Sequence, residues 1–346
     1  MTLSSSHLLI LLGPPPLYTV LLLKPGTWSN TLGKILRKIE GQRFCVVGMK
    51  AVTLTPQDFS LIISEDAKQD KALCSAHCDY LTSGPCLALC LQRHNSVLKL
   101  LDLLGPEDPE LCQAQDEFLW RAQYGSSVVQ NGMYCSTSYR TAIRDVKFFF
   151  AEGLPCDPSP VLETEQIPRL EQDVLLDSRA QRVAIKNNVP LSGALTDPDK
   201  PFVSALCQTT CLLFPPCTLH GCPPPYIHGV EKLIGRGFHV TAARLTVFNQ
   251  SQAQFVAALY SPTAGLSSQF KALSEGPCLL VAAQRDNAVS CFTSLMDSVN
   301  FEASPDQSFP AGVMCPQTEC QADKMISCFF DALTPDSIHQ VVPQDS

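Results

Sequence analysis

The sequence predicts an α+β fold in which a small antiparallel sheet is covered by helices, and it predicts this fold twice. The first observation is an internal repeat. Residues 83–97 read SGPCLALCLQRHNSV and residues 275–289 read EGPCLLVAAQRDNAV, so Gly-Pro-Cys and then Gln-Arg-x-Asn-x-Val recur at an offset of 192 residues. The second observation is that helical segments alternate with only a few apolar strands around each repeat, which favours an α+β domain.

The first copy is expected to open with an apolar strand over residues 17–23. A short amphipathic helix follows, because apolar residues from Leu32 to Ile39 recur at i, i+3 and i+4 spacing. The segments expected after it are, in order, a strand over residues 44–52, a polar helical stretch that ends at the Gly-Pro turn, a strand over residues 86–91, a helix from Asn95 and a last helix that carries Phe148 to Phe150.

The second copy repeats this order with shorter connections. Its opening strand is TTCLLF, its second strand is FHVTAARLTVF, and its third strand is CLLVAA after the second Gly-Pro turn. The domain boundaries that follow are an N-terminal tail at residues 1–16, a first domain at 17–152, an acidic Pro-rich linker at 153–203, a second domain at 204–334 and a tail at 335–346.

Composition excludes several classes of protein. The chain has 346 residues and 45% hydrophobic content, enough for two domains with cores of their own. The net charge is −8 and no run of Lys or Arg stands out, so neither nucleic acid nor a membrane surface is an expected partner. The apolar start of the chain lacks a basic leader and is interrupted by Gly13 to Pro16, so we expect neither a secretory signal nor a membrane helix there.

Seventeen cysteines are scattered along the chain in an odd number. In a long chain without an expected signal, we interpret them as reduced, small core residues, which indicates a cytoplasmic protein. The densest group contains Cys207, Cys211, Cys217, His220 and Cys222. Its spacing fits the paired C-x2-C pattern of zinc sites poorly, so no metal is expected.

Several short motifs stand in one order in the first copy: Leu23-Lys24-Pro25, the SGP turn, Leu104-Gly105-Pro106 and Asn131-Gly132-Met133-Tyr134. With these motifs the chain resembles the nucleoside diphosphate kinase family, and its tandem copies resemble the family's cilium- and flagellum-associated branch. The resemblance implies two ferredoxin-like domains, each a four-stranded antiparallel sheet covered by helices.

The resemblance also implies where chemistry is missing. Members of the family transfer a γ-phosphoryl group through a phosphohistidine in an Asn-x-x-His motif. Here Tyr134 stands at that position in the first copy and Met314 stands there in the second. A phenol with a reference pKa of ~10 is mostly protonated at pH 7, and a redox pair with Cys135 is disfavoured because no neighbouring base is visible. Asp145 matches the acid that orients the histidine, and we expect it to have no group left to orient.

The implied nucleotide pocket is only partly retained. Lys24, Arg121 and Asn131 match residues of the family that contact phosphate and ribose, whereas Leu73, Leu101 and Glu107 replace a stacking phenylalanine, an arginine and a threonine. Each lost charge-assisted contact costs about 1.5–3 kcal/mol. In the second copy, the position of Lys24 reads Pro215.

We therefore expect a catalytically inactive tandem protein that acts as a structural or assembly scaffold in motile cilia or flagella. Its expected partners are proteins of the axoneme or of dynein assembly, its expected location is the cytoplasm and the axoneme, and the two domains are expected to pair within the chain. The alternative is a first domain that binds ADP or ATP with magnesium, or that keeps residual kinase activity.

Overall fold

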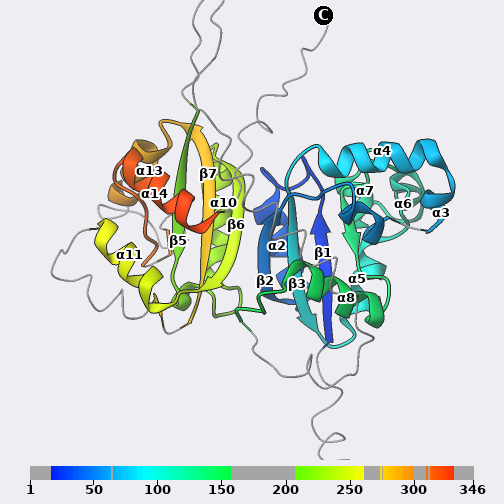
Figure 1. The fold of residues 1–346 in the computed structure, drawn as a ribbon, viewed down its shortest axis with the longest axis horizontal. Coiled ribbons are helices and arrows are strands. Elements are labelled where there is room, and N and C mark those ends of the chain that lie inside the picture. Colours follow the sequence, from blue (N-terminus) through cyan, green and yellow to red (C-terminus); the bar gives the residue numbers. More distant parts are fainter. Residues whose placement is uncertain are drawn as a thin grey trace, which may run out of the picture.

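In the computed structural model, described residues are 17–63, 65–156, 207–260, 273–274, 276–298, 309–310 and 312–330. The expected tail at residues 1–16, most of the linker and the tail at residues 335–346 lie outside these ranges. Both copies have the same layered form, with helices on the two faces of an antiparallel sheet (Figure 1).

The first copy has a β-α-β-β-α-β core, with extra helices inserted between its second and third strands and before its fourth, and its sheet has the strand order β4-β1-β3-β2, which is the ferredoxin-like arrangement. This confirms the α+β prediction. Its elements are β1 (Leu17–Leu23), α2 (Leu32–Gly41), β2 (Cys45–Val52), η1 (Asp58–Leu61), α3 (Glu65–Gln69), α4 (Lys71–Thr82), β3 (Cys86–Arg93), α5 (Ser96–Leu104), α6 (Pro109–Gln115), α7 (Trp120–Tyr124), β4 (Met133–Cys135) and α8 (Tyr139–Phe149).

Local sequence explains where these helices begin and which face they bury. The apolar stripe of α2 is fully buried, from Leu32 to Ile39. The side chain of Asp70 caps α4 by accepting hydrogen bonds from the second and third backbone N–H groups of the helix. Ser138 and Thr141 form a reciprocal capping box at the start of α8.

The second copy contains three sheet strands within the described residues. Its elements are β5 (Cys207–Phe214), η3 (Pro216–Thr218), α10 (Pro225–Gly235), β6 (His239–Val247), α11 (Gln250–Tyr260), β7 (Pro277–Asp286), α13 (Ala288–Ser298) and α14 (Glu319–Phe329). In place of the expected fourth strand, one bridge joins Leu213 to Met314. Gly312, at a φ of 82°, and Pro316, which has no N–H group, stand on either side of Met314 and leave little chain to pair.

Backbone irregularities recur at matching positions and mark the two copies as structural repeats. A bulge interrupts β2 between Val46 and Gly48, and another interrupts β6 between Val240 and Ala242. Asn95 and Asn287, 192 residues apart, both have a left-handed backbone, with φ values of 55° and 52°.

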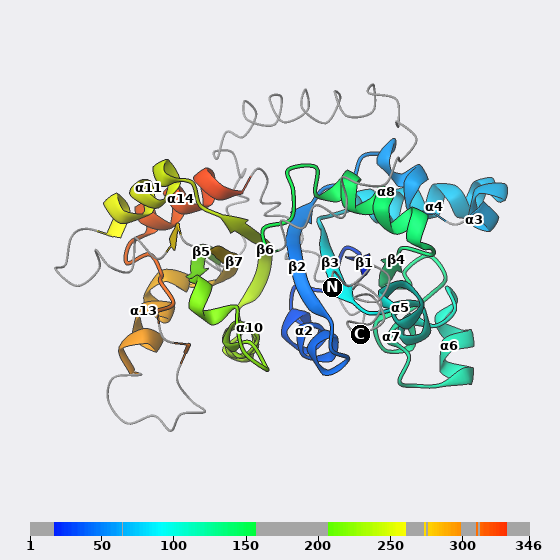
Figure 2. The ribbon, with the colours of Figure 1, turned by 90° about the horizontal axis from the view of Figure 1, so that it is seen from below.

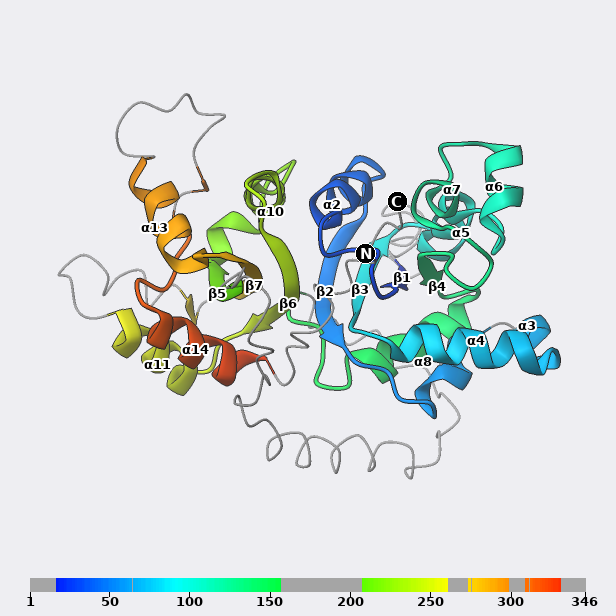
Figure 3. The same ribbon diagram turned by 90° about the horizontal axis from the view of Figure 1, so that it is seen from above.

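One seven-stranded sheet runs through both copies in the order β4-β1-β3-β2-β6-β7-β5. The edge strands β2 and β6 meet antiparallel at the pair Lys50 and Arg244, and α2 packs beside α10 on one face of the sheet (Figure 2). On that face a single apolar core continues from one copy into the other. The opposite face carries two separate cores, one under α4 and α8 and one under α11 and α14 (Figure 3).

The strand order reads the same from both ends, except that no described strand of the second copy corresponds to β4. The two copies are therefore related as the halves of a twofold dimer. Arg37 of α2 forms an ion pair with Glu231 of α10, and these two residues occupy equivalent places in their copies. The backbone of Gly33 lies close to Glu231 as well. No described helix combines the length and the apolar character needed to span a membrane.

Candidate functional site

The retained residues of the first copy gather at the end of β1. Lys24 follows the last residue of this strand, and its N–H group donates a hydrogen bond of 2.9 Å to the carbonyl of Gly132. Tyr134 lies on β4 directly opposite Leu22 of β1. The pairing of β1 with β4 therefore brings together residues that stand more than a hundred positions apart in the chain.

Lys24, Arg121 and Asn131 are all buried and all have partners within the protein. The Lys24 Nζ donates to Asn131 Oδ1 at 2.6 Å, and the Asn131 Nδ2 donates to the carbonyl of Glu107 at 3.1 Å. The Arg121 guanidinium donates to the carbonyls of Gly105 and Met133 at 2.6 and 3.3 Å. These side chains thus stabilise the loops around β4 through hydrogen bonds within the protein.

Burial has a chemical effect on Lys24. Desolvation, and next the charge of Arg121, lower the pKa of its ammonium group to about 8, against the weaker opposing effect of Glu107. A lysine in this state is a poorer anchor for a polyanion than an exposed one, because part of its population is neutral near physiological pH.

Tyr134 has acquired a set of partners around Asp145. Its hydroxyl donates to Asp145 Oδ2 at 2.7 Å, and the hydroxyl of Ser136 donates to the same oxygen at 2.8 Å. The guanidinium of Arg144 donates to Asp145 Oδ1 at 2.6 and 2.9 Å and to the Tyr134 hydroxyl at 3.1 Å. The expectation that Asp145 has nothing left to orient is therefore wrong, because the carboxylate accepts hydrogen bonds from three side chains.

This network holds the phenol in its protonated form. Burial raises the pKa of Tyr134 far above its usual range, and the charge of Asp145 and its hydrogen bond to the phenol add to this effect. A protonated phenol that donates its hydrogen bond to a buried carboxylate is a poor nucleophile.

Side chains of the protein fill the space around Tyr134. The remaining cavity has a volume of about 10 Å³, which is room for about one water molecule. Sites for small ligands typically have volumes of roughly 300–1,000 Å³. The cavity is lined by Lys24, Ile62, Ile63, His77, Leu81, Glu107, Arg121, Asn131, Met133 and Tyr134.

His77 is a member of this site that the sequence analysis did not select. It lies on α4, is buried, and its Nε2 has no hydrogen-bond partner among the described residues. Desolvation and the charge of Lys24 lower its pKa, with Glu107 opposing them. The spacing of Cys74, His77, Cys78 and Leu81 on one face of a helix was the signal that this imidazole points inward.

The three residues expected to weaken nucleotide binding have structural places of their own. Leu101 packs against the shared apolar core. The side chain of Glu107 is exposed, although it belongs to the cavity rim. Leu73 lies half-buried in the first turn of α4.

The second copy carries an apolar version of the same position. Met314 is buried, and it exchanges two backbone hydrogen bonds of 2.9 Å with Leu213. Leu22 stands opposite Ala88 and Leu213 stands opposite Leu280, and these two partners are 192 residues apart. By register, Met314 is therefore the counterpart of Tyr134, and a thioether offers neither a proton nor a nucleophile for phosphoryl transfer.

The thiols near these positions are buried and protonated. Burial raises the pKa of Cys135 to about 12, which keeps it from acting as a thiolate. Cys211, in the centre of β5, also has its pKa raised by burial. No three histidine, cysteine or acidic side chains converge in a metal-binding arrangement within the described ranges.

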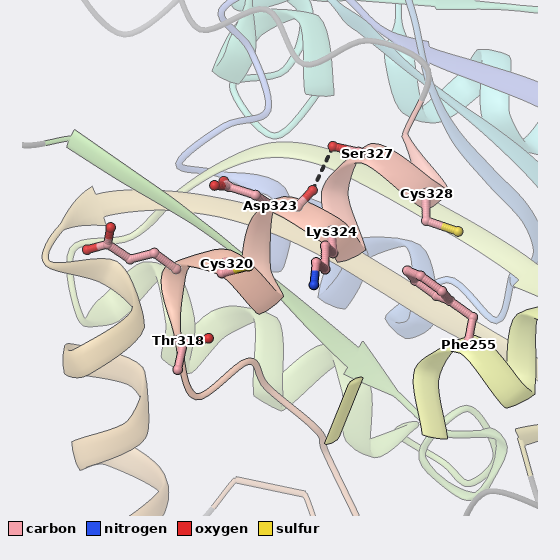
Figure 4. Close-up of a pocket in the computed structure, with 8 residues that line it drawn as sticks. Phe255, Thr318, Cys320, Asp323, Lys324, Ser327 and Cys328 are labelled. Atoms are coloured by element: carbon pink, nitrogen blue, oxygen red, sulfur yellow. Dashed lines mark hydrogen bonds between the residues drawn. The ribbon is translucent and has the colours of Figure 1, made fainter. Parts of the chain in front are cut away.

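An open surface groove of about 920 Å³ lies in the second copy between α11 and α14 (Figure 4). Phe255 forms one wall, and residues from Thr318 to Cys328 form the other. The hydroxyl of Ser327 donates to the carbonyl of Asp323 at 2.7 Å, and burial raises the pKa of the Cys328 thiol. The Cys328 thiol is therefore less ready to ionise than an ordinary cysteine.

Comparison with known proteins gives three findings. Residues 18–154 match the family model described as nucleoside diphosphate kinase. The chain is 63% identical over 334 residues to dynein axonemal assembly factor 8 of Xenopus laevis, and it covers 21% of that protein's length with 96% of its own. Solved structures of nucleoside diphosphate kinases from Aquifex aeolicus and Pyrobaculum aerophilum align at 23% and 18% identity, with TM-scores of 0.35 and 0.34, over 39% of this chain and 95% and 96% of theirs.

Proposed function

Since residues 18–154 carry a domain of the nucleoside diphosphate kinase family, we propose that this domain has lost phosphoryl transfer and that the chain is a scaffold in the assembly of axonemal dyneins. One observation supports the loss of activity. Tyr134, which the resemblance places at the position of the phosphorylated imidazole, donates a hydrogen bond of 2.7 Å to Asp145 and lines a cavity of about 10 Å³.

The assembly role rests on likeness to one relative. That protein, 63% identical to this chain, is named a dynein axonemal assembly factor, and this chain spans about a fifth of its length. The partners proposed here are therefore proteins of dynein assembly, and the proposed locations are the cytoplasm and the cilium. A filled site with a protonated phenol supports a binding role, because such a domain would act by binding other proteins at its surface.

The pairing of the copies supports the same role. The chain buries the edges of β2 and β6 against each other and shares one core between two domains. Contacts that single-domain relatives make between chains are here proposed to be made within one chain, which leaves a rigid platform with two different faces.

A phosphoryl-transfer assay tests the loss of activity. The purified 346-residue chain is incubated with labelled ATP, magnesium and a nucleoside diphosphate, with an active nucleoside diphosphate kinase as the positive control. We expect no labelled acceptor from the native chain. We also expect none from Tyr134→His, because restoring an imidazole leaves Glu107 and the filled cavity unchanged. Acceptor labelling that Tyr134→Phe abolishes would contradict the proposal.

Thermal unfolding with and without ADP and magnesium separates a scaffold from a nucleotide-binding module. A ligand that binds only the native state must raise its stability, by about 2.7 kcal/mol at a hundred times its dissociation constant. If the chain is a scaffold, we expect millimolar ADP to leave the unfolding temperature unchanged. A saturable shift that Lys24→Met removes would favour the binding module.

The assembly role has a cellular test that does not depend on nucleotide. In ciliated cells depleted of this protein, we expect axonemes to lose dynein arms in electron micrographs. Lys24→Met protein should restore the arms as well as the native chain does. Axonemes that keep their arms after depletion would rule out the assembly role.

A further inference from the structure

The junction between the two copies is closed on one side by a tryptophan. Trp28, in the loop between β1 and α2, is fully buried, and its indole N–H donates to the carbonyl of Pro85 at 3.1 Å. The next residue, Ser29, accepts a hydrogen bond of 2.9 Å from the N–H group of Val240 in β6. The loop of the first copy thus seals the edge of the second copy's sheet.

The corresponding loop of the second copy has no such seal. Thr27 and Thr218 each close the same turn by donating to the carbonyl three residues earlier, so Leu219 is the counterpart of Trp28. Leu219 is half-buried. Val46 is the counterpart of Val240, and no described residue of the second loop accepts a backbone hydrogen bond from it.

The substitution of leucine for tryptophan leaves a cavity between the copies. Its volume is about 550 Å³, within the range of roughly 300–1,000 Å³ that is typical of ligand sites, which occur preferentially at domain interfaces. Apolar side chains of both copies form its floor, among them Met49, Tyr226, Leu245 and Leu279. The exposed residues Arg43, His220 and Cys222 stand at its mouth.

We propose that this cavity receives a tryptophan side chain from a partner polypeptide, in the place that Trp28 fills on the other side of the junction. A large planar apolar group fits the floor, and Glu40 and Gln92 in the wall carry oxygens that can accept the indole N–H. The guanidinium of Arg43 at the mouth suits an acidic residue next to the tryptophan.

Neither tryptophan of these 346 residues can supply the indole. The chain contains two tryptophans, Trp28 and Trp120, and both are buried in the first copy. The inference deepens the proposed scaffold role, because it gives the chemistry of one partner contact. Its test uses purified components and can fail while the depletion experiment above succeeds, so the two failures are distinguishable.

The first test uses 5-fluoroindole as the probe and the native 346-residue chain. Cys222 lines the cavity, whereas Cys217 is an exposed thiol on η3 that lines neither this cavity nor the groove between α11 and α14. We expect the probe at millimolar concentration to slow alkylation of Cys222 by iodoacetamide at least threefold, as measured by mass spectrometry, and to leave the alkylation rate of Cys217 unchanged. Equal rates of Cys222 alkylation with and without the probe would overturn the proposal. This includes the case in which Cys222 does not react with iodoacetamide even without the probe.

The second test fills the cavity from within. Leu219→Trp should weaken binding of 5-fluoroindole at least tenfold in fluorine NMR and should raise the unfolding temperature. Leu98→Trp, at a leucine that is 59% exposed on α5, is the matched control and should leave binding unchanged. Equal binding by Leu219→Trp and native protein contradicts the assigned site.

The third test asks for a polypeptide. Peptides of about ten residues with a central Trp and acidic neighbours should displace 5-fluoroindole, while the same peptides with a central Ala should not. Equal displacement by both peptides, or displacement by neither, contradicts a tryptophan-bearing partner.

Discussion

Tyr134 and Asp145 are joined by a hydrogen bond in which the phenol is the donor and the carboxylate the acceptor. The phenol oxygen also accepts a hydrogen bond from Arg144. The Lys24 Nζ donates to Asn131 Oδ1 at 2.6 Å. These buried polar side chains therefore find their hydrogen-bond partners within the protein, as most buried polar groups do.

His77 is the exception in this cavity, because its buried Nε2 has no partner among the described residues. The charges that act on it are Lys24 and Glu107, and burial is the largest cause of its lowered pKa. The unfolded chain therefore takes up a proton on this histidine as the pH falls through ~6.5, while the folded chain takes it up only at a lower pH. Stability contributed by the neutral imidazole is consequently lost as the pH falls below that value.

The predicted result is a loss of stability between pH 7 and pH 5.5 that depends on His77. It is measured by urea unfolding of native protein and His77→Leu at both pH values. Titrating groups common to the two proteins cancel in the difference. An identical pH dependence in both proteins would show that the imidazole titrates normally in the fold.

The helices α2 and α10, which join the two copies, carry opposite charges at equivalent places. In a dimer of identical chains, residues at equivalent places near the twofold axis carry the same charge. Here Arg37 of α2 faces Glu231 of α10, so the two copies attract each other, whereas two first copies would oppose arginine to arginine. The ion pair itself is partly exposed and contributes little, but the alternative pairings are repelled.

Charge reversal tests this element. Glu231→Arg should lower the free energy of unfolding by roughly 1 kcal/mol, because it places like charges across the junction. The double variant Arg37→Glu, Glu231→Arg should recover most of this loss in urea unfolding. A double variant as unstable as the sum of the two single variants would mean that the side chains do not interact.

Gly33 and Gly41 form a matched pair on the same helix. A Cβ at Gly33 would lie 2.6 Å from Glu231 Cγ and 3.0 Å from its Cα, so Gly33→Ala should push α2 and α10 apart and cost about 1–3 kcal/mol. A Cβ at Gly41 would meet nothing within 4 Å, and Gly41→Ala should be neutral or should stabilise α2 by up to ~1 kcal/mol. Thermal unfolding of both variants measures their difference in stability. Equal changes in stability would contradict close packing of α2 against α10 at the junction.

At the scale of the whole molecule, the shared core makes the two copies one cooperative unit. Both tryptophans report on the first copy, while Phe292 lies fully buried in the second copy against Phe238 and Phe309. Because one apolar cluster contains all of these residues, the loss of packing in one copy should be felt in the other.

Phe292→Ala should therefore lower the midpoint of tryptophan fluorescence unfolding together with that of circular dichroism, at a cost of about 3–5 kcal/mol. Phe118→Ala, at a phenylalanine that is 71% exposed, is the control and should shift neither midpoint. A tryptophan transition that stays in place while circular dichroism splits into two steps would show two independent domains.

Local patterns predicted most of the first copy's elements because they are local properties. The apolar spacing from Leu32 to Ile39 matches α2, the Gly-Pro turn stands between α4 and β3, and the helices after Asn95 and Asn287 are present. The prediction of a fourth strand in the second copy was wrong, because it came from the family resemblance and did not take into account that Pro316 and Gly312 shorten this segment to a single bridge. The expected linker and tails lie outside the described residues.

The amino-acid sequence by itself determined the internal repeat and the α+β class, since these follow from recurring motifs and from hydrophobic periodicity. Only the tertiary structure decided that Asp145 has a new partner, that His77 enters the same cavity, and that Leu219 leaves space where Trp28 fills it. The physical reason is that these properties depend on distances between segments far apart in the chain, which packing sets and which no local pattern encodes.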